Sequence, residues 1–88
     1  MPDKFILLQK IRNGIKNVRL KTLIKLMFLF GFESRESKES IMFTHPKYNI
    51  RASTAKHTEK GQEKKVNFRY VNNCLRAIDE LLLEEGKK

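Results

Sequence analysis

The apolar residues of the N-terminal third of the chain recur with the period of an α-helix. One series contains Phe5, Leu8, Ile11 and Ile15, and a second contains Leu23, Leu26, Met27 and Phe30. This spacing predicts two helices, each buried along one stripe. Asp3 is suited to cap the first helix, and Gly14 to end it. Gly31, which can adopt positive φ, is expected to follow a second helix over 22–30.

After residue 31 the pattern changes to short segments of β character. Three such segments occur, at 32–35, 41–43 and 49–54. The polar residues 36–39 are expected to form the turn between the first two strands, and Pro46 to end the second. Within the third segment, alternation places Ile50 and Ala52 on the face opposite to Arg51.

The clearest helical pattern lies near the C-terminus, over residues 67–82. Its apolar stripe contains Val71, Cys74, Leu75, Ile78 and Leu82. Asn67 is a good N-cap residue for this helix. Residues 55–65 contain no apolar side chain beyond Ala55 and predict an exposed loop. The order of elements predicts an α+β domain in which a three-stranded antiparallel sheet packs on helices.

Length and composition indicate a single small domain. With 88 residues, the chain is close to the smallest size at which one core is self-sufficient. The longest apolar run, residues 26–30, is far too short to span a bilayer. The first three residues lack the pattern of a signal peptide, and the single cysteine cannot form an intramolecular disulfide. We therefore expect a cytoplasmic protein with no membrane partner.

The formal net charge of +9 is distributed unevenly along the chain. Lys and Arg dominate residues 1–32 and 47–69, whereas acidic residues dominate 70–86. Segregation of this kind is typical of a surface that binds a polyanion, because cations that neutralise phosphates release condensed counterions. The alternative interpretation is that the lysines only keep a small domain soluble. The clustering favours nucleic-acid binding.

Four short sequence motifs occur along the chain, and their order is more informative than any one of them. They are Asn17-Val18-Arg19-Leu20, Gly31-Phe32, Phe43-Thr44-His45-Pro46 and Val71-x-x-x-Leu75-x-x-Ile78. Together they resemble the HicA family of toxin–antitoxin mRNA interferases. The resemblance implies a double-stranded-RNA-binding-like α-β-β-β-α domain over 17–88, preceded by an extra helix within 1–16. It also implies a metal-independent endoribonuclease without a cofactor, whose partners are mRNA and a HicB-like antitoxin.

The chain departs from that family at the catalytic position. The family's second strand begins with Gly-Ser-His, in which the histidine is catalytic, and the matching residues here are Lys38, Glu39 and Ser40. Histidine serves as an acid and base because its pKa lies near neutrality, whereas a serine hydroxyl does not titrate in that range. The sequence therefore predicts poor RNA cleavage. His57 is the candidate substitute base, while His45 is interpreted as a turn residue.

The candidate RNA-binding residues are Lys38, Lys47, Arg51, Lys64, Lys65 and Arg69. Lys64, Lys65 and Arg69 flank the start of the last helix, where free backbone N–H groups and the helix dipole already favour a phosphate. The others are expected to project from the hairpin, the third strand and its turn. No metal site is expected, because one cysteine and two histidines show no ligand spacing.

Three functions are consistent with these features. The leading hypothesis is a HicA-like toxin that binds, and in its family cleaves, mRNA. The second is a non-catalytic RNA-binding domain of the same fold. The third is a protein-interaction module, in which the apolar surplus at Phe28 and Leu29 would form an interface.

Overall fold

A computed structural model describes residues 3–56 and 65–86 of the chain. Its elements in chain order are α1 (Lys4–Asn13), the 3-10 helix η1 (Ile15–Asn17), α2 (Leu20–Leu29), β1 (Glu33–Glu36), β2 (Ser40–Thr44), β3 (Arg51–Ala55) and α3 (Phe68–Gly86). Within the described ranges, the expected α+β domain with three α-helices and a three-stranded antiparallel sheet is confirmed. Most of the loop expected over 55–65 lies outside the described residues.

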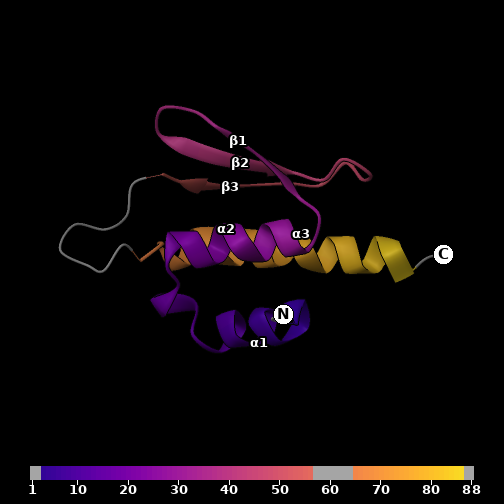
Figure 1. The fold of residues 1–88 in the computed structure, drawn as a ribbon, viewed down its shortest axis with the longest axis horizontal. Coiled ribbons are helices and arrows are strands. Elements are labelled where there is room, and N and C mark those ends of the chain that lie inside the picture. The colour runs from indigo at the N-terminus through magenta and orange to yellow at the C-terminus, as the bar shows by residue number, and fades with distance from the viewer. Residues whose placement is uncertain (1–2, 57–64, 87–88) are drawn as a thin grey trace.

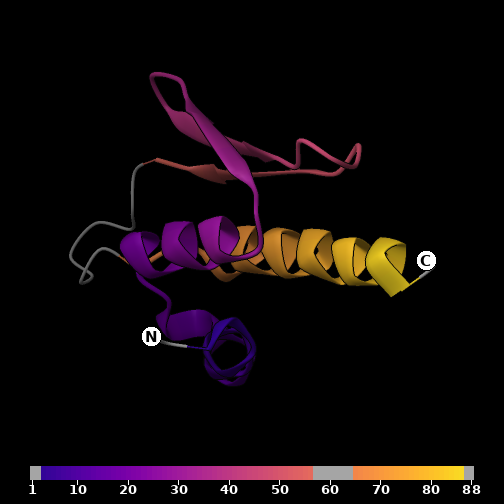
Figure 2. The same cartoon turned by 45° about the vertical axis from the view of Figure 1, so that its right-hand side comes forward.

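The elements are arranged in layers (Figures 1 and 2). The sheet, with strand order β1-β2-β3, lies on one side, and α2 and α3 lie together beneath it. The helix α1 lies on the other side of these two helices. α2 and α3 run in the same direction, so both begin at the same end of the molecule, which is the left end in Figure 1.

The inner face of the sheet supplies one wall of the core. Ile41 and Phe43 of β2, together with Ile50 and Ala52 beside and within β3, are buried, as the alternation predicted for the third strand. The strand β1 is different, because all four of its residues are exposed. Figure 2 shows the β1–β2 hairpin rising away from the helices, which leaves its tip without a layer to cover it.

The helices complete the same hydrophobic cluster. Leu8 and Ile11 of α1 belong to it together with the predicted stripes of α2 and α3. In α3 the stripe shifts at its end, so that Leu81 is buried and Leu82 is only half-buried. Cys74 is a buried free thiol, and burial raises its pKa to about 12, so the sulfur stays protonated at neutral pH.

The helix ends follow the expected capping residues. The carboxylate of Asp3 accepts the backbone N–H of Phe5, which caps α1. α2 ends in a Schellman motif, in which Gly31 N–H bonds to the carbonyl of Phe28 and Phe32 N–H bonds to that of Met27. Gly31 has φ 88°, a conformation that glycine adopts without strain.

Candidate nucleic-acid interface

The first turns of α2 and α3 are held together by a short backbone pairing. Arg19 and Lys65 form an isolated antiparallel bridge, and Val66 N–H donates to the carbonyl of Val18 at 2.7 Å. Each of these segments leads directly into its helix. Because the two helices are parallel, the positive ends of their dipoles are adjacent. Neither first turn contains an acidic residue.

Cations lie at the end of the molecule where these two helices start, in a region that we call the basic end. It includes Lys38 in the β1–β2 turn and Lys56 directly after β3. Its residues are Lys16, Arg19, Lys21, Lys38, Lys56, Lys65 and Arg69. Several local contacts place them there: the Lys16 ammonium lies 5.9 Å from the ring centre of Phe68, and Lys56 N–H bonds to the Glu39 carbonyl. A cation at the start of a helix destabilises the helix by about 0.3–1 kcal/mol, because it is repelled by the positive end of the helix dipole. A bound anion would offset this cost.

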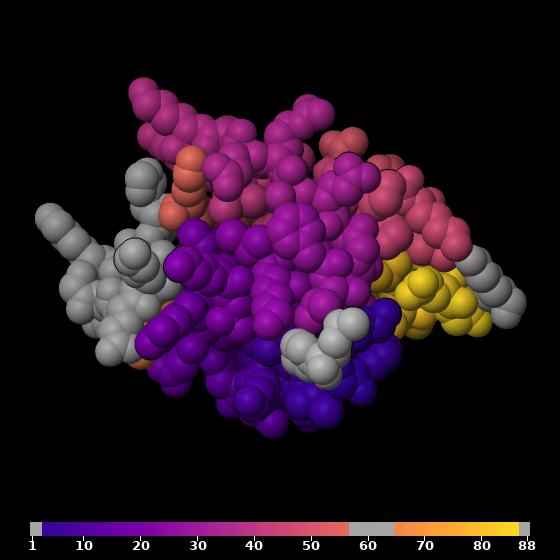
Figure 3. Space-filling model, viewed as in Figure 1, coloured from indigo at the N-terminus to yellow at the C-terminus, as the bar shows by residue number. Residues whose placement is uncertain are grey.

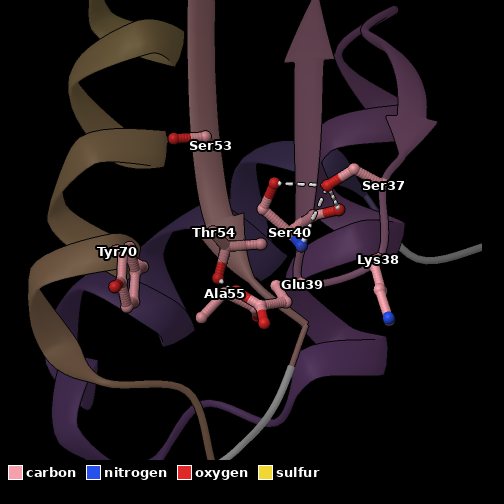
Figure 4. A pocket seen from close by; sticks show the side chains of 8 residues that line it. All are labelled: Ser37, Lys38, Glu39, Ser40, Ser53, Thr54, Ala55 and Tyr70. Carbon is pink, nitrogen blue, oxygen red and sulfur yellow. Dashed lines mark hydrogen bonds between the residues drawn. The ribbon is translucent and has the colours of Figure 1, made fainter.

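A shallow depression lies beside the basic end (Figure 4). It is lined by the hairpin residues Ser37, Lys38, Glu39 and Ser40, by Ser53, Thr54 and Ala55 of β3, and by Tyr70 of α3. The hydroxyl oxygens of Ser37 and Ser40 are 2.8 Å apart, and Ser40 N–H donates to Ser37 Oγ. The depression therefore offers hydroxyl groups beside an exposed ammonium, which suits hydrogen bonding to a phosphate or a sugar.

Ser40 has no histidine near it among the described residues. His45 follows the other end of β2, and five residues of extended chain place it roughly 16 Å from Ser40. Its Nδ1 accepts the N–H of Lys47, and its ring packs edge-on against Phe32. His45 is thus a packed turn residue, as the sequence indicated. His57, the candidate substitute base, lies outside the described residues.

The structure divides the predicted RNA-binding residues into two groups. Lys38, Lys65 and Arg69 belong to the basic end, with Lys65 Nζ donating to Asn17 Oδ1. Lys47 and Arg51 lie at the opposite end of the β2–β3 ladder, where Thr44 rather than Ser40 is the partner of β3. Lys64 lies outside the described residues.

The surroundings of the second group include carboxylates of α3. Lys47 lines one depression with Glu80 and Glu84, and Arg51 lines another with Glu80 and Arg76. These carboxylates lower the positive potential that the two cations present to a polyanion. Among the residues that the structure describes, the acidic side chains at the basic end are Glu36 and Glu39, and Glu36 is paired with Lys56 at 3.2 Å.

Sequence reasoning did not single out four cations of the basic end. These are Lys16, Arg19, Lys21 and Lys56. The grouping of Lys16, Arg19 and Lys21 with the start of α3 depends on the bridge between Arg19 and Lys65, which are far apart in the chain, whereas Lys56 follows β3 and bonds to Glu39. The charge excess of residues 1–32 was the available signal for the first three, and that of residues 47–69 for Lys56. Within residues 3–56 and 65–86, no group of three potential metal ligands occurs.

No helix in the described ranges is both long and apolar enough to cross a membrane. Comparison of the chain with family models, with curated proteins and with solved structures finds no match.

Proposed function

We propose that this chain binds structured RNA through its basic end, as a HicA-like protein on a double-stranded-RNA-binding-like fold. The observation that carries the proposal is the convergence of two parallel helix starts, joined by the Arg19–Lys65 bridge, within one group of cations. Free N–H groups, helix dipoles and ammonium or guanidinium groups all favour phosphate there.

The order of elements supports the fold part of the proposal. Without α1, the sequence of elements is α2-β1-β2-β3-α3, and both helices lie on one face of the sheet. Double-stranded RNA is recognised mainly by its shape and by contacts to phosphates and 2′-hydroxyls. Such recognition needs spaced cations and hydroxyls rather than a deep pocket. The depression around Ser37, Ser40 and Tyr70 provides hydroxyls next to the cations.

Catalysis is the weaker part of the family resemblance for this chain. Ser40 occupies the position of the family histidine and bonds to another serine instead of to a base. A misplaced or missing general base typically costs on the order of a hundredfold to ten-thousandfold in rate. We therefore propose binding as the primary activity. The implied HicB-like antitoxin would neutralise the protein by covering the basic end, for which an acidic surface is suited.

One observation favours the alternative of a protein-interaction module. Phe28 is 54% exposed on α2, the helix that lies at the surface between α1 and the sheet in Figure 3. Leu29 is half-buried, so the apolar surplus expected at this pair is exposed mainly at Phe28. Phe28 alone is a small apolar surface beside Lys21 and Lys25. This alternative is consequently secondary to RNA binding.

The binding experiment compares an RNA duplex with a DNA duplex of the same sequence, using fluorescence anisotropy at fixed salt. We expect the RNA to bind about tenfold more tightly, a difference of about 1.4 kcal/mol, because A-form shape and 2′-hydroxyls are recognised. Equal affinity for both duplexes would reduce the function to general polyanion binding. Absence of binding to either would overturn the proposal.

Cleavage is measured on the same RNA with the unmodified protein and a His57→Ala variant. The expected result is little or no cleavage by either. Cleavage that disappears in the variant would identify His57 as the base, and cleavage by both would place the active site elsewhere.

A further inference from the structure

The outer edge of β1 is open to pairing. The strand lies at the edge of the sheet, pairs with β2 on its inner side only, and has all of its residues exposed. Its sequence is Glu33-Ser34-Arg35-Glu36. An exposed edge presents unpaired backbone N–H and C=O groups, which are a template for another strand.

The hydrogen-bond alternation of the hairpin identifies which groups point outward. Ser37 N–H bonds to the Ser40 carbonyl at 2.8 Å, so this pair is a hydrogen-bonded one. In an antiparallel ladder bonded and non-bonded pairs alternate, which makes Arg35–Met42 and Glu33–Thr44 the next bonded pairs. The backbone groups of Ser34 and Glu36 therefore face the open edge.

Charge along β1 selects one way for a second copy to pair there. In an antiparallel pair, a residue whose backbone groups face the open edge must lie opposite a residue of the second copy whose backbone groups also face that edge. If Ser34 lies opposite Ser34 of the second copy, Glu33 of each chain lies opposite Arg35 of the other. These are non-hydrogen-bonded pairs, in which opposite side chains are closest. If Ser34 lies opposite Glu36 instead, the two Arg35 side chains face each other and repel, and if Glu36 lies opposite Glu36, the two carboxylates repel.

We propose that two copies of this chain pair through their β1 edges, antiparallel and centred on Ser34, to form a continuous six-stranded sheet. The side chains of Glu33 and Arg35 have no ion-pair or hydrogen-bond partner among the residues that the structure describes. Each is therefore available for the reciprocal ion pairs of a two-fold interface. Charged edge strands usually prevent pairing, but here the order of charges is complementary to itself.

The interface is small, which determines how it must be measured. Four residues from each chain bury less than the roughly 1,200 Å² of a standard stable interface. The dimer is therefore expected at high protein concentration. Sedimentation or light scattering should show the mass of the full chain rising from one 10.4 kDa chain toward two as concentration increases. A mass that stays that of one chain throughout would overturn the proposal.

Charge exchange tests the register. Glu33→Arg places Arg opposite Arg35, and Arg35→Glu places Glu opposite Glu33, so each variant alone is expected to remain a monomer. An equimolar mixture of the two variants restores both attractive pairs and is expected to form the mixed dimer. Glu85→Arg, an exposed change on α3, is the matched control and should dimerise as the unmodified chain does. Dimerisation of both single variants, or its absence from the mixture, would contradict the Ser34-centred pairing.

A backbone variant tests the edge itself. Ser34→Pro removes the outward N–H, which the β1–β2 ladder does not use, so the fold is expected to persist while dimerisation is lost. Circular dichroism verifies the fold of this variant. A folded Ser34→Pro protein that still dimerises would show that copies associate through another surface.

Discussion

At the scale of single residues, Gly31 joins α2 to the sheet under two constraints. Its φ of 88° lies in the left-handed region, and a Cβ added to it would lie 3.2 Å from His45 Nε2. The His45 ring cannot move away easily, because it packs against Phe32 and Tyr48. Gly31→Ala should therefore lower the free energy of unfolding by about 1–3 kcal/mol in a urea titration.

Gly14→Ala is the matched control for that substitution. Its added Cβ would meet only the Lys10 carbonyl at 3.8 Å, an ordinary contact, and its φ is negative. We expect this variant to change stability by less than about 1 kcal/mol. A double variant, Gly31→Ala with His45→Ala, removes the close contact but not the backbone strain. If the double variant loses as much free energy of unfolding as the two single variants together, the contact with His45 has no role in the effect of Gly31→Ala.

At the scale of elements, the attachment of α1 depends on apolar burial. Ile11 is 3% exposed within the common core, whereas Arg12 and Asp79 form an ion pair between α1 and α3 at the surface. Burial of an aliphatic side chain contributes more than a solvated ion pair. Ile11→Ala should lower the free energy of unfolding by about 2–4 kcal/mol, and Arg12→Ala by less than about 1 kcal/mol. Equal losses in chemical denaturation would contradict this ranking.

The first turn of α3 is expected to show opposite effects on stability and on binding. Arg69 is exposed at a positive helix end, where its N–H is capped by Asn67 Oδ1 at 2.9 Å. Arg69→Glu should stabilise the protein by roughly 0.3–1 kcal/mol, because an acidic side chain suits the dipole. The same change should weaken RNA binding, which anisotropy measures. Arg69→Gln should have an intermediate effect on both, and tighter RNA binding by Arg69→Glu would contradict the proposed interface.

The periodic patterns in the sequence predicted which helices and strands form more accurately than they predicted the residues at which these elements begin and end. The apolar stripes of α2 and α3 and the alternation around Ile50 were visible because each follows the period of its own element. α2 begins at Leu20, two residues before the predicted 22, since its start is set by pairing with the segment at Lys65. The first strand was weakly patterned because β1 is exposed on both faces.

At the scale of the whole molecule, the chain separates its charges along α3. The basic end surrounds the start of this helix, and Asp79, Glu80, Glu84 and Glu85 lie in its C-terminal half. The sequence predicted the sign of the charge and three of the seven described cations at this end. It could not predict that Lys47 and Arg51 lie near Glu80, because that proximity depends on how β3 packs beside α3.

The salt dependence of RNA binding by two matched double variants shows whether RNA binds at the basic end or at the opposite end of the molecule. One variant, Lys38→Ala with Arg69→Ala, removes two cations from the basic end, and the other, Lys47→Ala with Arg51→Ala, removes two from the opposite end. Both change the net charge equally. We expect the first to weaken binding and to reduce the slope of log affinity against log salt by about 2, with little change in the second. The reverse result, or equal slopes in both variants, would contradict the account.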